Sequence, residues 1–333
     1  MTYLAALVVI SPLVLLYVLF VRWVDRYEPE PWWILCICFL WGAIGATLGG
    51  GIATAVAQEL TRGAILGTEA MDAISATFYA PIFEESFKGV GVIFVFVLGH
   101  LIFHEFDGPL DGVVYGGIIG LGFTLTEDTL YIGQAGAESG AAGFVTLTVL
   151  RTIFGGLAHA LFTSMTGLGW GMVVVSRGPI RKLLWPCFGF FMAMLLHGIH
   201  NALPSYLGGA GGLMTIVLTW FFFLGWFILI GALVASERRV VLRQLSNEIG
   251  GLVRDQKELV HLATIFARGF SHFGILTSRG FGPFRATRRR HRALVELALV
   301  KERRGRGDTA AKLIREEGRL RAEIATLMQR GAL

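Results

Sequence analysis

Long apolar runs separated by short polar breaks dominate the first two thirds of the chain. Pro, Gly or charged residues mark most of the breaks. Seven runs can be distinguished, at roughly residues 3–22, 32–57, 82–103, 112–133, 143–175, 183–203 and 213–235. Their lengths are close to or above the ~20 residues that a helix needs to cross a bilayer. The pattern therefore predicts an all-α, polytopic membrane helix bundle of about seven transmembrane helices.

An eighth span is the alternative for residues 64–80, which are also fairly apolar. This stretch contains Glu69 and Asp72 and is followed by Pro81. Charged residues are costly in a bilayer helix, and proline interrupts one, so we interpret it as an interfacial or re-entrant helix that ends at Pro81. Small residues four positions apart predict helix-packing surfaces within the runs, at Gly45/Gly49, Gly116/Gly120 and Gly167/Gly171.

Composition supports a membrane protein. The 333 residues are 54% hydrophobic and only 16% charged, and the mean hydropathy is +0.63, which does not fit a soluble domain. Three cysteines, Cys36, Cys38 and Cys187, all fall in apolar runs. Their odd number and location do not indicate a disulfide framework, so we expect buried thiols.

Charge divides the chain at about residue 236. Residues 1–235 hold 8 Lys and Arg against 14 Asp and Glu, whereas residues 236–333 hold 21 against 10, a net charge of +11. The positive-inside rule places such a segment in the cytoplasm, and the loop with Arg177, Arg181 and Lys182 agrees. We predict a membrane-embedded helical domain at 1–235, an N-terminus outside, and a basic cytoplasmic helical tail at 236–333.

The tail pattern predicts a helical hairpin across Gly305–Gly307. Asp308 or Thr309 is placed to cap its second helix, and one face of that helix is apolar, with Leu313, Leu320, Ile324 and Leu327. Its basic charge suits anionic lipids or a partner, or it only fixes the topology of a solvated helix pair. We expect no nucleic-acid binding, because no recognition fold accompanies the charge.

Four of the apolar runs carry side chains that a bilayer should exclude. They are Glu84, Glu85 and Lys88, then Glu127 and Asp128, then Arg151 and His159, and finally His197, His200 and Asn201. A charged side chain at the centre of a bilayer helix costs roughly 2.5–3.5 kcal/mol, so these groups need partners or a task. Each run presents one polar stripe, because two side chains in it are four residues apart and share a helix face. The pairs are Glu84 and Lys88, Phe123 and Glu127, His159 and Thr163, and His197 and Asn201. The stripes predict one shared polar pocket.

Depth gives a second argument for one pocket. If successive spans alternate in direction, Glu84, Glu127 and His197 all lie toward the outer leaflet, within about 10 Å of the same surface at ~1.5 Å per residue. His159 is expected about two turns deeper, where it would border the pocket from below.

The polar runs are similar to known motifs. EESFK resembles the EExxK of the PrsW family of intramembrane glutamic proteases, which are related to CAAX prenyl proteases and bacteriocin-processing enzymes. GFTLTEDTLY is similar to that family's second motif, a Phe and a Glu four apart, and HALFTS and HGIHNAL resemble its two His motifs. DRYEPEPWW, residues 25–33, resembles the entry to the second span. The family commonly has Asn where this chain has Asp128, and the tail lies outside the resemblance.

The resemblance implies an endopeptidase of the bacterial cytoplasmic membrane that cleaves membrane-anchored proteins, such as an anti-sigma factor, with glutamate-activated water. Glu84 would be the base, and Glu85 would orient the water or be structural, although the two roles can be exchanged. His197 would polarise the water or stabilise the oxyanion, and Asn201 would orient it. Glu127 and His159 would complete the pocket, with Lys88 and Phe123 in support.

Other interpretations use the same residues. Two His and a Glu are a common zinc set, yet the HExxH pattern is absent, so we expect no cofactor and keep a zinc site of Glu84, His159 and His197 as the alternative. A transporter or proton pathway would use the same acids, and a catalytically silent scaffold would bind a partner helix in the pocket. The glutamates could also form a structural ion pair with Lys88 or Arg151.

Overall fold

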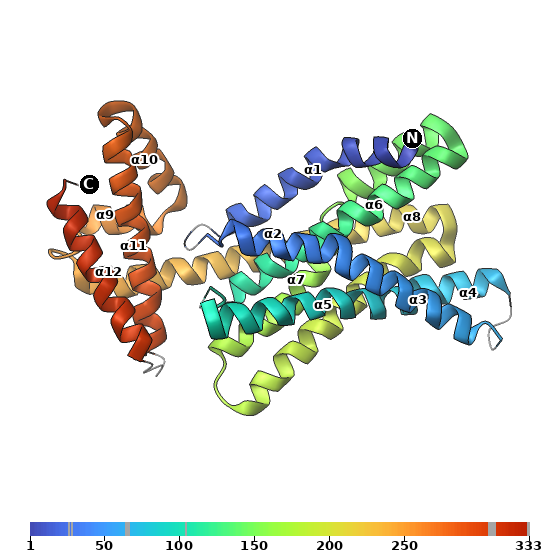
Figure 1. The fold of residues 1–333 in the computed structure, drawn as a ribbon, viewed down its shortest axis with the longest axis horizontal. Coiled ribbons are helices and arrows are strands. Elements are labelled where there is room, and N and C mark those ends of the chain that lie inside the picture. Colours follow the sequence, from blue (N-terminus) through green and yellow to red (C-terminus); the bar gives the residue numbers. More distant parts are fainter. Residues whose placement is uncertain (26, 28, 64–66, 104, 306–310, 332–333) are drawn as a thin grey trace. The chain divides into compact units, whose positions relative to one another are not determined.

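The computed structural model describes residues 1–25, 27, 29–63, 67–103, 105–305 and 311–331. Over these residues the regular structure is helical and contains no strand (Figure 1), which confirms the predicted fold class. The chain forms two compact units. The membrane unit consists of Met1–Asp25 and Glu30–Ile230, and the tail unit of Arg26–Pro29 and Gly231–Leu333.

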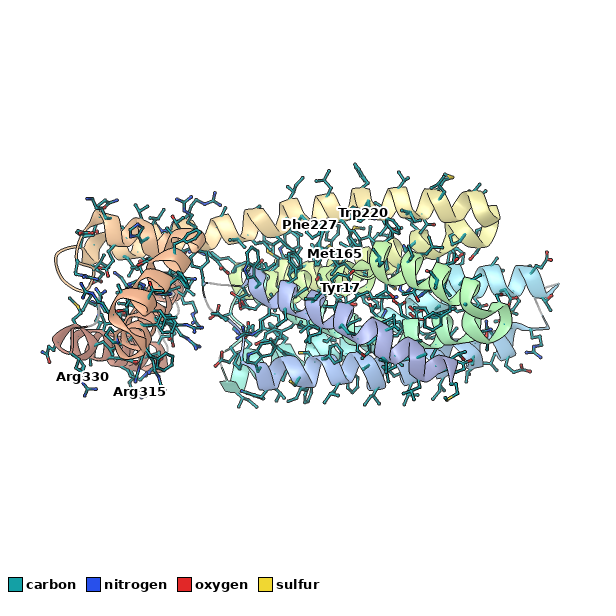
Figure 2. All side chains as sticks on the ribbon, turned by 90° about the horizontal axis from the view of Figure 1, so that it is seen from above. Tyr17, Met165, Trp220, Phe227, Arg315 and Arg330 are labelled. Carbon is teal, nitrogen blue, oxygen red and sulfur yellow. The ribbon has the colours of Figure 1, made fainter. Side chains whose placement is uncertain are left out.

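The helices of the membrane unit lie side by side (Figure 1). They are α1 (Thr2–Val24), α2 (Trp32–Leu40), α3 (Thr47–Thr61), α4 (Thr68–Ile74), α5 (Ala80–Leu98), α6 (Pro109–Leu147), α7 (Ala158–Val175) and the first part of α8 (Pro179–Leu245). Short π-helical stretches extend or connect them, at Trp41–Ala46, Ser75–Tyr79, Gly99–Phe103 and Thr148–Phe154. Many large apolar side chains project outward from this unit, among them Trp220, which is 50% exposed (Figure 2).

Four helical stretches in the described residues are long and apolar enough to cross a membrane. They are Thr2–Val24, Trp32–Thr61, Pro109–Val175 and Pro179–Glu248. The last two reverse direction within the stretch, at Gly140 with φ 65° and at Gly208 with φ 55°. Only glycine adopts such a conformation readily, so these residues permit the reversals. With both reversals counted, and with α5 included, the unit has the seven segments that the sequence predicts.

Glycines set the contact between α6 and α7. A Cβ built on Gly112 would lie 2.0 Å from the carbonyl oxygen of Gly167, and one built on Gly120 would lie 2.2 Å from that of His159. Backbones approach this closely only where side chains are missing, which confirms the predicted packing role of the glycine pairs in these two helices. The two helices are antiparallel, and their register places His159 opposite Gly120.

The stretch before α5 is not a separate interfacial helix. The helix that begins at Thr68 passes through the π-helical turn Ser75–Tyr79 into α5, and Pro81 lies in the first turn of α5. Proline has no N–H for the preceding turn, and the wider π-helical turn lets the helix continue past it. The predicted end at Pro81 is therefore wrong, while residues 64–66 lie outside the described residues.

The cysteine prediction is right for one residue. Cys38 is buried, whereas Cys36 and Cys187 are exposed. An apolar run in a membrane protein faces lipid as well as protein, so apolar neighbours alone do not indicate burial within the fold.

The tail unit contains the end of α8 and four further helices, α9 (Gln256–Ala263), α10 (Ile265–Arg279), α11 (Phe281–Gly305) and α12 (Ala311–Gln329). The predicted hairpin is formed by α11 and α12. Leu320, Ile324 and Leu327 are buried, and Leu313 is partly buried against the same core. Residues 306–310, with the expected caps Asp308 and Thr309, lie outside the described residues. Arg315 and Arg330 project from this unit (Figure 2).

The connection between α1 and α2 belongs to the tail unit. Tyr27 is 2% exposed, its hydroxyl donates to the carbonyl oxygen of Ala263 at 2.5 Å, and its ring belongs to the core with Leu259 and Leu262. A tail unit on one side of a membrane requires an even number of crossings between residues 27 and 231. The six segments that follow α1 satisfy this condition.

The contact between α6 and α7 gives a stability prediction. Gly167→Val adds a Cβ 1.8 Å from the carbonyl oxygen of Gly112, so the helices must separate, and we expect a loss of about 1–3 kcal/mol. Thermal unfolding in detergent measures the change. Gly225→Val is the matched control, because nothing described lies within 4 Å of a Cβ built there. Equal midpoints for the two variants would contradict the proposed packing.

Candidate active site

The polar side chains of four apolar segments meet in the membrane unit. They are Glu84, Glu85 and Lys88 of α5, Glu127 and Asp128 of α6, Arg151 of the π-helical stretch Thr148–Phe154, His159 of α7, and His197 of α8. Glu85 and Lys88 have no exposed side-chain surface, and His197 has 1%. Charged groups at this depth in the fold are stable only with direct partners, and each contact below supplies one.

Glu85 has three direct partners. Lys88 Nζ donates to its Oε1 at 2.8 Å, His197 Nδ1 lies 3.0 Å from the same oxygen, and Thr163 Oγ1 donates to Oε2 at 3.2 Å. These contacts join α5 to α7 and α8. A buried carboxylate with a cation and two further partners is held rigidly in its charged form.

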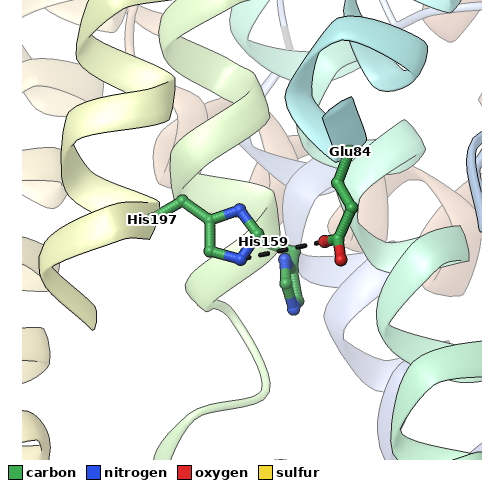
Figure 3. A group of neighbouring side chains, drawn as sticks. All are labelled: Glu84, His159 and His197. Carbon is green, nitrogen blue, oxygen red and sulfur yellow. Dashed lines mark ion pairs between the residues drawn. The ribbon is translucent and has the colours of Figure 1, made fainter. Parts of the chain in front are cut away.

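Glu84 is much less engaged. Its Oε2 lies 3.6 Å from Lys88 Nζ and 3.8 Å from His197 Nε2, beyond hydrogen-bonding distance, and it is buried without a hydrogen-bond partner in the described part of the chain. Gly50 of α3 packs on this residue, since a Cβ there would lie 3.0 Å from Glu84 Cα. Figure 3 shows the Glu84 carboxylate directed toward His197 and His159. Of the two adjacent acids, Glu84 is the one left available to a ligand.

His159 lies within the cluster rather than below it. Its Nε2 is 2.7 Å from Glu127 Oε2, its Nδ1 is 3.1 Å from Lys88 Nζ, and its ring centroid is 5.0 Å from that of His197. The expected position two turns deeper is wrong for the side chain. Helical side chains lean toward the N-terminal end of their helix, so on antiparallel helices Glu127 and His159 lean toward each other and close the offset between their backbones.

Arg151 neutralises the acids of α6. Its Nη2 donates to Glu127 Oε2 at 2.5 Å and its Nε donates to Asp128 Oδ1 at 2.7 Å. Thr152 Oγ1 also donates to Asp128, at 3.0 Å. Asp128 therefore acts as a second anchor for the Arg151 guanidinium.

Phe123 supports Lys88. The Lys88 Nζ lies 3.6 Å from the centroid of the Phe123 ring, a cation–π contact, and the same ring lies 4.9 Å from the His159 ring. The aromatic face thus covers the side of the ammonium that the acids leave open.

Asn201 does not reach the cluster. Its Nδ2 donates to the carbonyl oxygen of Ala76 at 3.1 Å, in the π-helical turn before α5. Pro81, five residues later, has no N–H to offer this turn, and Asn201 supplies a donor in its place. His200 is also engaged elsewhere, with Thr219 at 2.9 Å. These contacts differ from the expected role of Asn201 in orienting a water.

Three side chains of the cluster are placed to bind a metal ion. Ligand atoms of Glu84, His159 and His197 all lie within 4.8 Å of one another, and two His with one Glu form a zinc set (Figure 3). Glu85 on His197 and Glu127 on His159 are carboxylates of the kind that orient metal-bound imidazoles. The donor set therefore fits a metal, although Lys88 Nζ already contacts the His159 nitrogen that faces away from Glu127.

A second acidic group was missed by the sequence analysis. Asp25, Glu30 and Asp111 are buried, with carboxylate oxygens within 4.8 Å of one another. The amide groups of Asp107 and Gly108 donate to Asp111 Oδ2 at 2.7 and 2.8 Å. The acids of DRYEPEPWW were the available signal, but their convergence with Asp111 of α6 depends on the tertiary fold.

Similarity to known proteins covers the membrane unit from α2 onward. Residues 30–246 match the model of a family described as PrsW family intramembrane metalloprotease. The chain belongs to the PrsW family. It is 30% identical to Protease PrsW of Geobacillus kaustophilus over 199 aligned residues, which are 59% of this chain and 79% of that protein. Identity to Protease PrsW of Oceanobacillus iheyensis is 30% over 213 residues, 64% and 87% of the two chains. No solved structure matches.

Membership of the PrsW family confirms the resemblance drawn from the motifs. The matched range contains all the residues of the cluster, from Glu84 to His197, and ends at α8. The chain is therefore an integral membrane protein and an intramembrane protease. The helices α9 to α12 of the tail unit lie outside the PrsW match.

The unequal engagement of the two glutamates predicts unequal stability effects. Glu85→Gln leaves the buried Lys88 without its charged partner, and we expect a loss of about 3–5 kcal/mol. Glu84→Gln keeps that pair and should change the free energy of unfolding much less. Thermal unfolding of both variants in the same detergent tests this. A Glu84→Gln variant as unstable as Glu85→Gln would show that Glu84 also holds the fold.

Proposed function

We propose that this PrsW-family protein is a glutamic endopeptidase in which Glu84 activates the attacking water. The observation that carries the proposal is the buried Glu84 Oε2, which faces His197 Nε2 at 3.8 Å beside a fully engaged Glu85. That separation is too long for a direct hydrogen bond and suits two acceptors that share one water.

Hydrogen-bond partners assign the protons of the two histidines. Glu85, paired with Lys88, accepts the proton of His197 Nδ1, so a neutral His197 presents the lone pair of Nε2 toward Glu84. Glu127, paired with Arg151, accepts from His159 Nε2, and Lys88 donates to His159 Nδ1. A water between Glu84 and His197 then donates to both and directs its own lone pair at the substrate carbonyl carbon.

The reaction follows from these positions. Glu84 removes a proton from the water as the oxygen bonds to the carbonyl carbon, and the carbonyl oxygen becomes an oxyanion. The Lys88 ammonium, 3.6 Å from Glu84 Oε2, supplies positive charge next to the reacting atoms. Glu84 then returns the proton to the amide nitrogen while the C–N bond breaks, which releases a carboxylic acid and an amine and leaves Glu84 ionised again.

Metal-assisted hydrolysis is the second candidate. The description of the matched family as a metalloprotease and the ligand geometry favour it. A zinc ion held by Glu84, His159 and His197 would polarise the attacking water. Glu85 and Glu127 would then hold the two imidazoles in their ligating orientations.

Substrate and orientation complete the proposal. The substrates are membrane-anchored proteins, with anti-sigma factors as the class that the PrsW resemblance suggests, cut toward the outer face. The net charge of +11 after residue 236 supports a cytoplasmic tail, and the place of Tyr27 in the tail unit supports the same side for the connection after α1. Labelling from outside intact cells of cysteines introduced after residue 236 would contradict this orientation.

Replacing the base gives the central prediction. Glu84→Gln keeps the shape but removes the proton acceptor, and we expect cleavage of a co-expressed single-span substrate to fall about 10²- to 10⁴-fold at normal membrane abundance. Immunoblots of substrate and product measure the loss. Glu138→Gln is the matched control, because Glu138 is an exposed acid of α6 that accepts a hydrogen bond from Gln134.

Full cleavage by an abundant Glu84→Gln, Glu85→Gln double variant would remove both acids from the chemistry. The transporter and scaffold interpretations would then account for the buried cluster. A flux assay in liposomes separates these two, since only a transporter moves a solute or protons.

Metal removal distinguishes the two hydrolytic mechanisms. If Glu84 activates water without a metal, chelators should leave the cleavage rate unchanged, and the purified protein should contain far less than one zinc per chain. Metal analysis and rate measurements on the same preparation test this. About one zinc per chain, lost in His197→Gln, would establish the metal-assisted mechanism in place of the glutamate-only one.

A further inference from the structure

The tail unit carries a stretch of unusually uniform charge. Residues 259–295, which span the end of α9, α10 and the first part of α11, contain seven Arg and no Lys, Asp or Glu. This stretch lies outside the residues that match the PrsW family. Its charge therefore serves this chain in a way that the shared protease fold does not explain.

The same stretch exposes large aromatic side chains. Phe270 and Phe273 of α10 are 76% and 64% exposed, and Phe281 at the start of α11 is 66% exposed. Phe270 and Phe273 are three residues apart and share one face of α10. The tail unit buries Leu294, Leu297 and other apolar side chains in its own core. Exposed aromatic side chains next to such a core mark a surface that something else covers.

Several arginines of this stretch are also exposed. Among the described residues, no acidic side chain pairs with the four arginines Arg279, Arg285, Arg288 and Arg292. Phe281, Arg285, Arg288 and Arg292 are spaced by four, three and four residues, so they form one stripe along α11. By contrast, Arg289 pairs with Glu323 and Arg290 with Glu258. The exposed stripe thus combines an aromatic side chain with uncompensated positive charge.

We propose that α10 and the first part of α11 form a docking surface for anionic phospholipid. Phe270, Phe273 and Phe281 enter the boundary between headgroups and acyl chains, while the exposed arginines bind lipid phosphates. Aromatic side chains beside Arg on helices that lie on a bilayer are typical of such surfaces. Basic segments close to a span are attracted to anionic leaflets.

Chain connectivity favours a bilayer over a soluble partner. The tail unit is joined to membrane segments at three places, because α8 runs into it and the α1–α2 connection passes through its core at Tyr27. A lipid surface is therefore always within a short tether of this unit, whereas a soluble partner must arrive by diffusion. The positive charge of the exposed arginines and the permanent connection to membrane segments both support anionic phospholipid as the occupant.

Spin labelling of the full-length protein in liposomes tests the proposal. A single cysteine replaces Thr277, which is exposed one turn after Phe273, in a Cys36→Ser, Cys38→Ser, Cys187→Ser background. Accessibility of the label to oxygen, which partitions into lipid, is compared with accessibility to a water-soluble nickel chelate. Thr326→Cys on α12, also exposed, provides the matched control label.

With phosphatidylglycerol in the liposomes, we expect the docked population reported at Thr277 to rise on the order of tenfold over phosphatidylcholine alone. The Thr326 label should not change. An Arg285→Gln, Arg288→Gln, Arg292→Gln variant should abolish the lipid dependence, and Phe270→Ser, Phe273→Ser should lower the oxygen accessibility in anionic liposomes.

Three results would overturn the proposal. Equal accessibilities at Thr277 in both lipids would show that anionic lipid does not dock there. Persistence of the lipid effect in the arginine variant would remove its electrostatic basis. Spin–spin broadening that disappears on dilution with unlabelled protein would instead place a second copy of the chain on this surface.

Discussion

A single buried ammonium organises the polar centre of this membrane protein. Lys88 Nζ contacts Glu85 at 2.8 Å, His159 at 3.1 Å and the face of Phe123 at 3.6 Å, and the side chain has no exposed surface. These partners come from three different helices, so the ammonium is satisfied only when α5, α6 and α7 are correctly packed. Removing one partner leaves a buried charge uncompensated, which is more costly than any single contact is worth. The centre therefore specifies the bundle as well as the chemistry.

The charges of the cluster also single out one acid. Arg151 serves Glu127 and Asp128, and Lys88 serves Glu85 most closely. Glu84 is the acid with the longest separation from a cation, 3.6 Å to Lys88 Nζ, and its Oε2 has no hydrogen-bond partner among the described residues. In a site of low dielectric, a carboxylate in this position can take up and release a proton while the closer Lys88–Glu85 ion pair stays intact. Glu85 thus has the structural role and Glu84 the proposed reactive one. Adjacent residues of one helix can differ in this way because their side chains face different neighbours.

Hydropathy and charge placement were sufficient to predict the seven apolar segments and the residues of the cluster. They failed where backbone detail decides the outcome. The π-helical turn Ser75–Tyr79 carries the helix past Pro81, which no pattern of polar and apolar residues reveals. Lys88 could reach either glutamate, since spacings of three and four both share a helix face, and only packing selects Glu85. The position of His159 and the partner of Asn201 likewise depend on helix register and on the lean of side chains.

The position of Lys88 also bears on the choice between the two mechanisms. His159 Nε2 binds Glu127, which leaves only Nδ1 for another partner. Lys88 Nζ already contacts Nδ1, so it competes for this nitrogen with a metal held by Glu84, His159 and His197. Two cations this close repel each other strongly in a low dielectric, so the ammonium would have to move before a metal could bind. With Glu85, His159 and Phe123 all holding Lys88 in place, the chain already supplies the positive charge that a metal would bring. This arrangement supports the proposed activation of water by Glu84.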